Sequence, residues 1–147
     1  MTKSKNNDLW ADIAEDVIEL SPRQLMKEQA AYLKEKTKGL LVAEVLTSQT
    51  GKTLSTTEGG TAGREKFIQT FSLVVPTLKY RYDLFSVSHH VLGYPAKFDY
   101  NYSKEDLVAK EDMIANNEKE FLSILKSILS SDKTSRILAS LLAQARA

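Results

Sequence analysis

The chain has 147 residues, of which 42% are hydrophobic and 27% charged, so it is long enough and apolar enough to bury a core as one domain. Its 20 basic and 19 acidic residues are balanced along the whole length, and no segment clusters lysine and arginine as phosphate-backbone binding requires, which disfavours nucleic acid as a partner. The absence of cysteine excludes disulfides, thiolate nucleophiles and cysteine-based zinc sites.

The first third of the chain predicts two helices after a frayed start. Residues 1–7 are polar, whereas residues 8–20 repeat apolar side chains at helical spacing. Ser21 and Gln24 then form a capping-box pattern, with a proline between them at the first helical position. This pattern predicts a second helix that runs to about Lys36.

A short strand and a long loop are predicted next. Residues 40–47 are β-branched and bounded by glycine and polar residues, which is typical of a strand. Residues 48–65 contain four of the six glycines and seven serines or threonines, so we expect a long flexible loop. A Gly-Lys-Thr run at residues 51–53 resembles part of a phosphate-binding loop, but Leu46 stands where that motif needs glycine, so nucleotide binding is not indicated.

The middle of the chain predicts three more strands. Nine of the twelve aromatic residues lie within residues 67–102. Residues 67–75 and 80–90 alternate in character with period two, although Gln69 interrupts an apolar face, and a turn signal precedes a last strand at residues 96–102. Because the links are short, we expect an antiparallel meander rather than parallel strands with crossovers.

Strict alternation divides the strand expected at residues 80–90 into two faces. One face holds Arg81, Asp83, Phe85, Val87 and His89, and the other holds Tyr80, Tyr82, Leu84, Ser86, Ser88 and His90. The tyrosines are therefore expected to point away from Phe85.

The C-terminal third predicts two to three helices. A capping pattern at residues 103–106 opens a short polar helix to about Met113, Asn117 caps an amphipathic helix, and residues 130–132 separate it from a last helix. The predicted fold is therefore α+β: one domain over residues 1–147, with a four-stranded, mostly antiparallel curled sheet flanked by two N-terminal helices and two to three C-terminal helices.

The histidine pair is the obvious candidate for metal binding or acid–base chemistry. Neighbouring residues of a strand point to opposite faces, so His89 and His90 cannot easily chelate one ion, and the chain has no other histidine. Asp83 shares a face with His89 but lies six residues away, roughly 20 Å at strand rise. We expect a structural pair, with one ring N–H on a backbone carbonyl at the core edge and the other ring on the surface. No catalytic residue, metal or cofactor is predicted.

The tyrosines of the same region are the second group of candidates. Tyrosine is enriched at protein interfaces, but it also fits a half-buried position in a sheet, so packing and partner contact are both open. The candidate partner- or ligand-binding residues are Tyr80, Tyr82, His89, His90, Tyr94, Tyr100 and Tyr102.

Two functions follow from these residues. The first is a non-enzymatic binding protein that contacts another protein, as an inhibitor of the immunity type, an adaptor or a complex subunit. The alternative is a small-ligand-binding protein or enzyme with a pocket lined by histidine and tyrosine inside the curled sheet. Surplus apolar surface on the C-terminal helices would instead form a homodimer. Because neither a signal-peptide pattern nor an apolar run of ~20 residues is present, we expect a cytoplasmic protein with no membrane partner.

Overall fold

The computed structural model describes residues 7–12, 19–50, 66–100 and 113–147. Its elements, in chain order, are α1 (Pro22–Lys36), β1 (Val42–Thr50), β2 (Lys66–Val75), a short 3-10 helix (Pro76–Leu78), β3 (Tyr80–His89), β4 (Ala96–Asp99), β5 (Ile114–Ala115), α2 (Glu118–Leu129) and α3 (Asp132–Arg146). Neighbouring strands are all antiparallel in the order β1-β2-β3-β4-β5, so the α+β class and the meander are confirmed.

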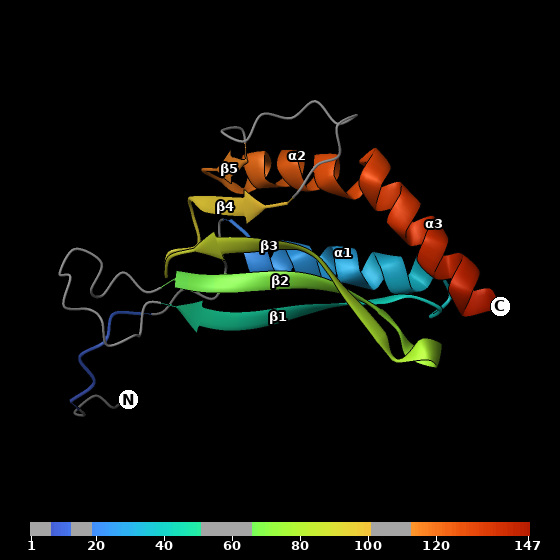
Figure 1. The fold of residues 1–147 in the computed structure, drawn as a ribbon. Helices are drawn as coiled ribbons and strands as arrows, with labels where there is room; N and C mark the ends of the chain where they lie inside the picture. The colour runs from blue at the N-terminus through green and yellow to red at the C-terminus, as the bar shows by residue number, and fades with distance from the viewer. Residues whose placement is uncertain (1–6, 13–18, 51–65, 101–112) are drawn as a thin grey trace.

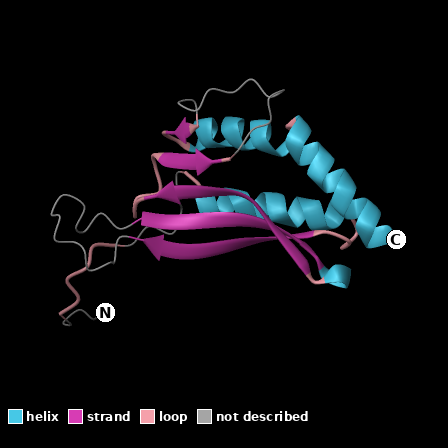
Figure 2. Cartoon of the chain, in the orientation of Figure 1, coloured by secondary structure: helices cyan, strands magenta, loops and turns pink. Residues whose placement is uncertain are grey.

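The molecule has two layers (Figure 1). Helix α1 packs along one face of the sheet, α2 lies beside β4 and β5, and α3 runs from the end of α2 across the end of the sheet at which β3 begins. Figure 2 shows how the β2–β3 hairpin twists away from the rest of the sheet at that end. None of the described helices is long and apolar enough to cross a membrane.

Side-chain caps fix where the helices begin. The Oγ atom of Ser21 accepts from the Gln24 backbone N–H at 3.2 Å, and the Gln24 side chain accepts from the Ser21 N–H at 2.9 Å, as the capping-box pattern predicts. Asn117 caps α2 in the same way, through the Glu120 N–H at 2.9 Å.

Several expectations differ from the structure. Residues 48–50, expected at the start of the long loop, continue β1, and residues 51–65 lie outside the described residues. Residues 8–12 and 19–20 of the first expected helix are not helical, and residues 13–18 lie outside the described residues. A short amphipathic segment without a surface to pack on gains too little to form a helix. The sheet has a fifth strand, since Ile114–Ala115 pairs with β4, and two residues are too few to show a periodic pattern. The polar helix expected at residues 103–112 lies outside the described residues.

A β-bulge changes which way the tyrosines point. Phe71 pairs with Phe85 but Ser72 pairs with Asp83, so Leu84 is an extra residue on β3. Beyond the bulge, Tyr82 pairs with the buried Leu73, and paired residues share a face. Strict alternation was therefore wrong for the start of β3: the faces exchange at Leu84, and the tyrosines lie on the same face as Phe85.

Aromatic rings connect the sheet to α2. Phe71 stacks on Phe85 with 5.2 Å between ring centroids, Phe85 contacts Phe98 at 6.0 Å, and Phe98 contacts Phe121 of α2 at 4.7 Å. Phe71, Phe98 and Phe121 are each 2% exposed or less. The aromatic-rich middle of the chain thus supplies the centre of the core.

Candidate functional site

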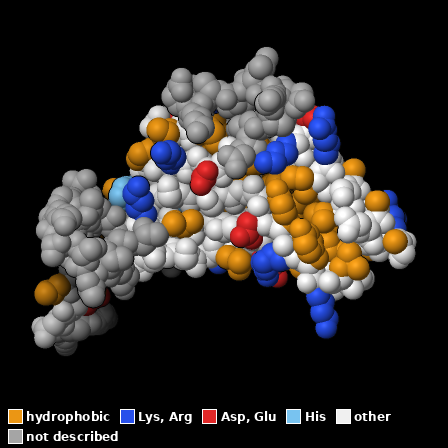
Figure 3. All heavy atoms as spheres, viewed as in Figure 1, with side chains coloured by type: hydrophobic (Ala, Val, Ile, Leu, Met, Phe, Trp, Pro, Cys, Tyr) orange, Lys and Arg blue, Asp and Glu red, His pale blue; other side chains and the backbone are white. Residues whose placement is uncertain are grey.

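An open groove lies where the start of β3 meets α3, and we call it the tyrosine groove. Tyr80 and Tyr82 form its sheet side, and its volume is about 390 Å³. The α3 side is formed by Arg136, Ile137, Ser140, Leu141 and Gln144. Figure 3 shows apolar side chains gathered over this part of the molecule. The side chain of Tyr80 is 46% exposed, Tyr82 is half-buried and Leu141 is buried, so the groove has an apolar floor and an accessible rim.

Within the described residues, one edge of β3 has no neighbouring strand beside this groove. Among the described strands, β4 pairs only with residues 86–89 of β3, so residues 80–85 have no described strand on that side. An unpaired strand edge presents backbone N–H and C=O groups at every second residue, and such an edge can accept an added strand.

A polar hollow adjoins the tyrosine groove. Its volume is about 280 Å³, and Tyr82 lines both spaces. Asp83 and Asp99 contribute carboxylates to this hollow and Lys133 of α3 contributes an ammonium group. The Asp83 carboxylate already accepts from the Ser72 hydroxyl at 2.5 Å. The apolar groove therefore has a neighbouring surface with mixed charge.

Tyr100 is a structural residue rather than an exposed contact. It is 7% exposed, and its hydroxyl lies 2.8 Å from the hydroxyls of both Ser131 and Thr134. Ser131 also caps α3 by accepting from the Thr134 backbone N–H. Tyr100 thus fixes the end of β4 to the start of α3, and we leave it out of the proposed contact surface.

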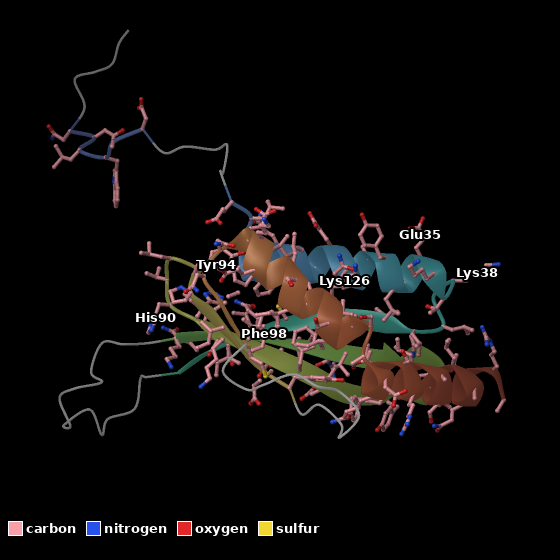
Figure 4. All side chains as sticks on the ribbon, turned by 90° about the horizontal axis from the view of Figure 1, so that it is seen from above. Glu35, Lys38, His90, Tyr94, Phe98 and Lys126 are labelled. Atoms are coloured by element: carbon pink, nitrogen blue, oxygen red, sulfur yellow. The ribbon has the colours of Figure 1, made fainter. Side chains whose placement is uncertain are left out.

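Tyr94 fixes the entry of α1 to α2. Its hydroxyl donates to the Leu20 carbonyl at 2.7 Å, and its ring meets Phe121 edge-on at 6.2 Å. Figure 4 places Tyr94 beside α2. Burial, together with the nearby carboxylates of Glu19 and Glu118, raises the pKa of the Tyr94 hydroxyl to about 12.

His89 belongs to a directional polar network on the helix-covered side of the sheet. Its Nδ1–H donates to the His90 carbonyl at 2.8 Å, because a carbonyl can only accept. Its Nε2 then accepts from the Gln69 amide at 3.2 Å, and the Gln69 carbonyl oxygen accepts from the Thr47 hydroxyl at 2.7 Å. Gln69 interrupts an apolar strand face because it satisfies the buried histidine.

The side chain of His90 joins neither this network nor the groove. His90 is exposed and lies at the outer end of β3, as labelled in Figure 4. Tyr102 lies outside the described residues. In the described part of the chain, no three His, Asp or Glu side chains come close enough to hold a metal ion.

Of the six candidates that the structure describes, it brings Tyr80 and Tyr82 together in the groove and places Tyr94, Tyr100 and the two histidines elsewhere. It adds Ile137 and Leu141 of α3 to the site. Their spacing of four residues is typical of one face of a helix, but it gives no sign that this face meets the start of β3.

Comparison with family models, characterised proteins and solved structures finds no match for this chain. The function is therefore argued from the geometry of the described residues.

Proposed function

We propose that this chain is a non-enzymatic binding protein that acts by contact with another protein, and that the tyrosine groove makes the contact. The observation that supports the proposal is the position of Tyr80 and Tyr82 beside Ile137 and Leu141 in an open groove. Anchors at protein interfaces are typically aromatic or arginine side chains seated around an apolar centre.

The chemistry of the groove fits that role. Tyrosine has two side-chain torsions, so it offers a large apolar area at a low cost in conformational entropy and keeps a hydroxyl for a hydrogen bond. Arg136 stands at the rim, where its side chain also pairs with Asp132 at 2.8 Å. The apolar floor would bury a hydrophobic side chain of the partner while the rim sets its orientation.

The open edge of β3 suggests how the partner lies. An extended segment that pairs with residues 80–85 would gain backbone hydrogen bonds, and its alternate side chains would enter the tyrosine groove. The partner is therefore proposed to contribute a short strand with an apolar residue at alternate positions.

The alternative function, a pocket that uses His89 or His90, has weaker support. Both ring nitrogens of His89 already have hydrogen-bond partners, and His90 is exposed at a strand end. A ligand would have to displace the Gln69 amide to reach His89, which would leave buried polar groups without partners.

Substitution of both tyrosines tests the proposal. The Tyr80→Ala/Tyr82→Ala variant should reduce the amount of co-purifying partner at least tenfold in affinity capture from the source cells, since one anchor residue is often worth ~2 kcal/mol. Direct binding to the purified partner should weaken by the same factor.

A matched control removes apolar surface elsewhere. Val91→Ala/Leu92→Ala alters two exposed side chains at the opposite end of the sheet, so capture should be unchanged. Denaturant unfolding of both variants is measured alongside capture, because Tyr80 is 46% exposed but Tyr82 packs partly buried against the core, so its truncation should also cost stability. Capture is compared under conditions in which both variants are folded. The proposal would be contradicted if both variants captured the partner equally well. It would also be contradicted if the tyrosine variant lost capture only in proportion to its unfolded fraction.

A further inference from the structure

The described N-terminal segment, residues 7–12, exposes the only tryptophan of the chain. Trp10 is 81% exposed and its neighbour Leu9 is 93% exposed. Figure 4 shows this segment standing away from the body of the molecule. Two adjacent large apolar side chains in such a position are typical of a contact surface.

The folded part of the molecule has a cleft with mostly apolar lining residues, which we call the apolar cleft. It lies between α1 and α3 above the inner face of the sheet and has a volume of about 200 Å³. A cavity of ~150 Å³ is large enough to bind benzene, so this cleft can take the larger part of an indole ring. Among its lining residues are Tyr32, Leu33, Lys36, Leu84, Leu129 and Leu138.

We propose that Trp10 and Leu9 of one copy of this chain dock in the apolar cleft of a second copy, and that the exchange is reciprocal. The described residues of a single copy show both an exposed apolar segment and an open apolar cleft, and one exchange covers both. A reciprocal exchange is closed by twofold symmetry, so it gives a dimer and not a filament.

Position favours a second copy over the same copy. Leu20 is held at the start of α2 by a hydrogen bond from its N–H to the Glu118 carboxylate at 3.0 Å. The cleft lies along the second half of α1, at the opposite end of that helix from Leu20. The described segment of the same copy projects away from this end, whereas a neighbouring copy is free to approach it.

Charge supports the same pairing. The cleft has one charged lining residue, Lys36, and the last turn of α1 also holds Lys34 and Glu35, so this turn carries a net positive charge. The docking segment is flanked by two carboxylates, Asp8 and Asp12, and holds no basic residue between them. The carboxylates would lie near the lysines when the indole is seated.

The single tryptophan allows a direct test. The Trp10→Ala variant has no tryptophan and is silent in tryptophan fluorescence, yet it keeps an intact cleft. A dilute, monomeric sample of the wild-type chain is titrated with an excess of this variant. Docking in the second copy predicts a saturable blue shift of the Trp10 emission, together with a dimeric mass by light scattering.

A second silent chain gives the control. Tyr32 is 54% exposed and Lys36 is exposed, so Trp10→Ala/Tyr32→Ala/Lys36→Glu should fold normally with an altered cleft. It should bind the wild type at least tenfold more weakly. An emission that does not respond to either variant, a blue shift in a monomer that is independent of concentration, or equal binding by both silent chains would overturn the proposal.

Discussion

At the scale of single residues, burial separates tyrosines that the sequence could only group together. Tyr80 and Tyr100 both lie in the aromatic-rich region, but Tyr80 is 46% exposed and Tyr100 is 7% exposed. The difference arises because β4 ends at Asp99 and the next side chain turns inward to the hydroxyls at the start of α3. Nothing in the local pattern encodes this long-range contact.

Removal of one hydroxyl should separate a structural role from a binding role. Tyr100→Phe leaves Ser131 and Thr134 without their shared partner in a buried position, so the free energy of unfolding should fall by about 1–3 kcal/mol. Tyr80→Phe, at an exposed position, should change it by less than ~0.5 kcal/mol. Urea titration measures both values. If Tyr100→Phe weakened partner capture at unchanged stability, Tyr100 would instead belong to the contact surface.

At the scale of elements, α1 and α2 were predictable because the signals that begin them are local. The capping box at Ser21 and the cap at Asn117 each act within four residues, and both begin a helix where the sequence indicates. The β3 faces were not predictable, because the bulge at Leu84 depends on how β2 and β3 pair. That pairing decides the site, since it turns Tyr80 and Tyr82 toward α3.

The junction between α1 and α2 should show a specific pH dependence. The raised pKa of Tyr94, about 12 against an ordinary value of 10.0, means that the folded protein favours the neutral phenol. Its contribution to stability is therefore complete below pH 10 and is lost as the pH rises from 10 toward 12.

Comparison with Tyr94→Phe isolates this effect from other groups that titrate in the same range. The variant lacks the hydrogen bond to the Leu20 carbonyl, so at pH 7 it should be less stable than the wild type by about 1 kcal/mol. The difference should shrink above pH 10, because only the wild type loses stability through ionisation of this hydroxyl. A difference in unfolding free energy that stays constant from pH 7 to pH 11 would contradict the assignment.

At the scale of the whole molecule, the α+β class and the antiparallel meander could be predicted from the order of the periodic segments. The exposed contact surfaces could not be predicted in this way. Residues 8–20 have helical periodicity in sequence, but residues 8–12 are exposed and not helical in one copy. Periodicity reports that apolar side chains recur, and it does not report what covers them. Contact with another protein, or with a second copy of the chain, would bury the apolar side chains of residues 8–12.

A dimer built by exchange should also make thermal stability depend on concentration. Association stabilises the folded state by mass action, so a tenfold higher chain concentration should raise the Tm of the wild type by roughly 1–4 °C. Trp10→Ala removes the docking side chain from both copies, so its Tm should not change with concentration. Differential scanning calorimetry over a hundredfold range of concentration measures both slopes. A wild-type Tm that is equally independent of concentration would mean that Trp10 adds nothing to folded-state stability in solution, and the exchange would then have no thermodynamic support.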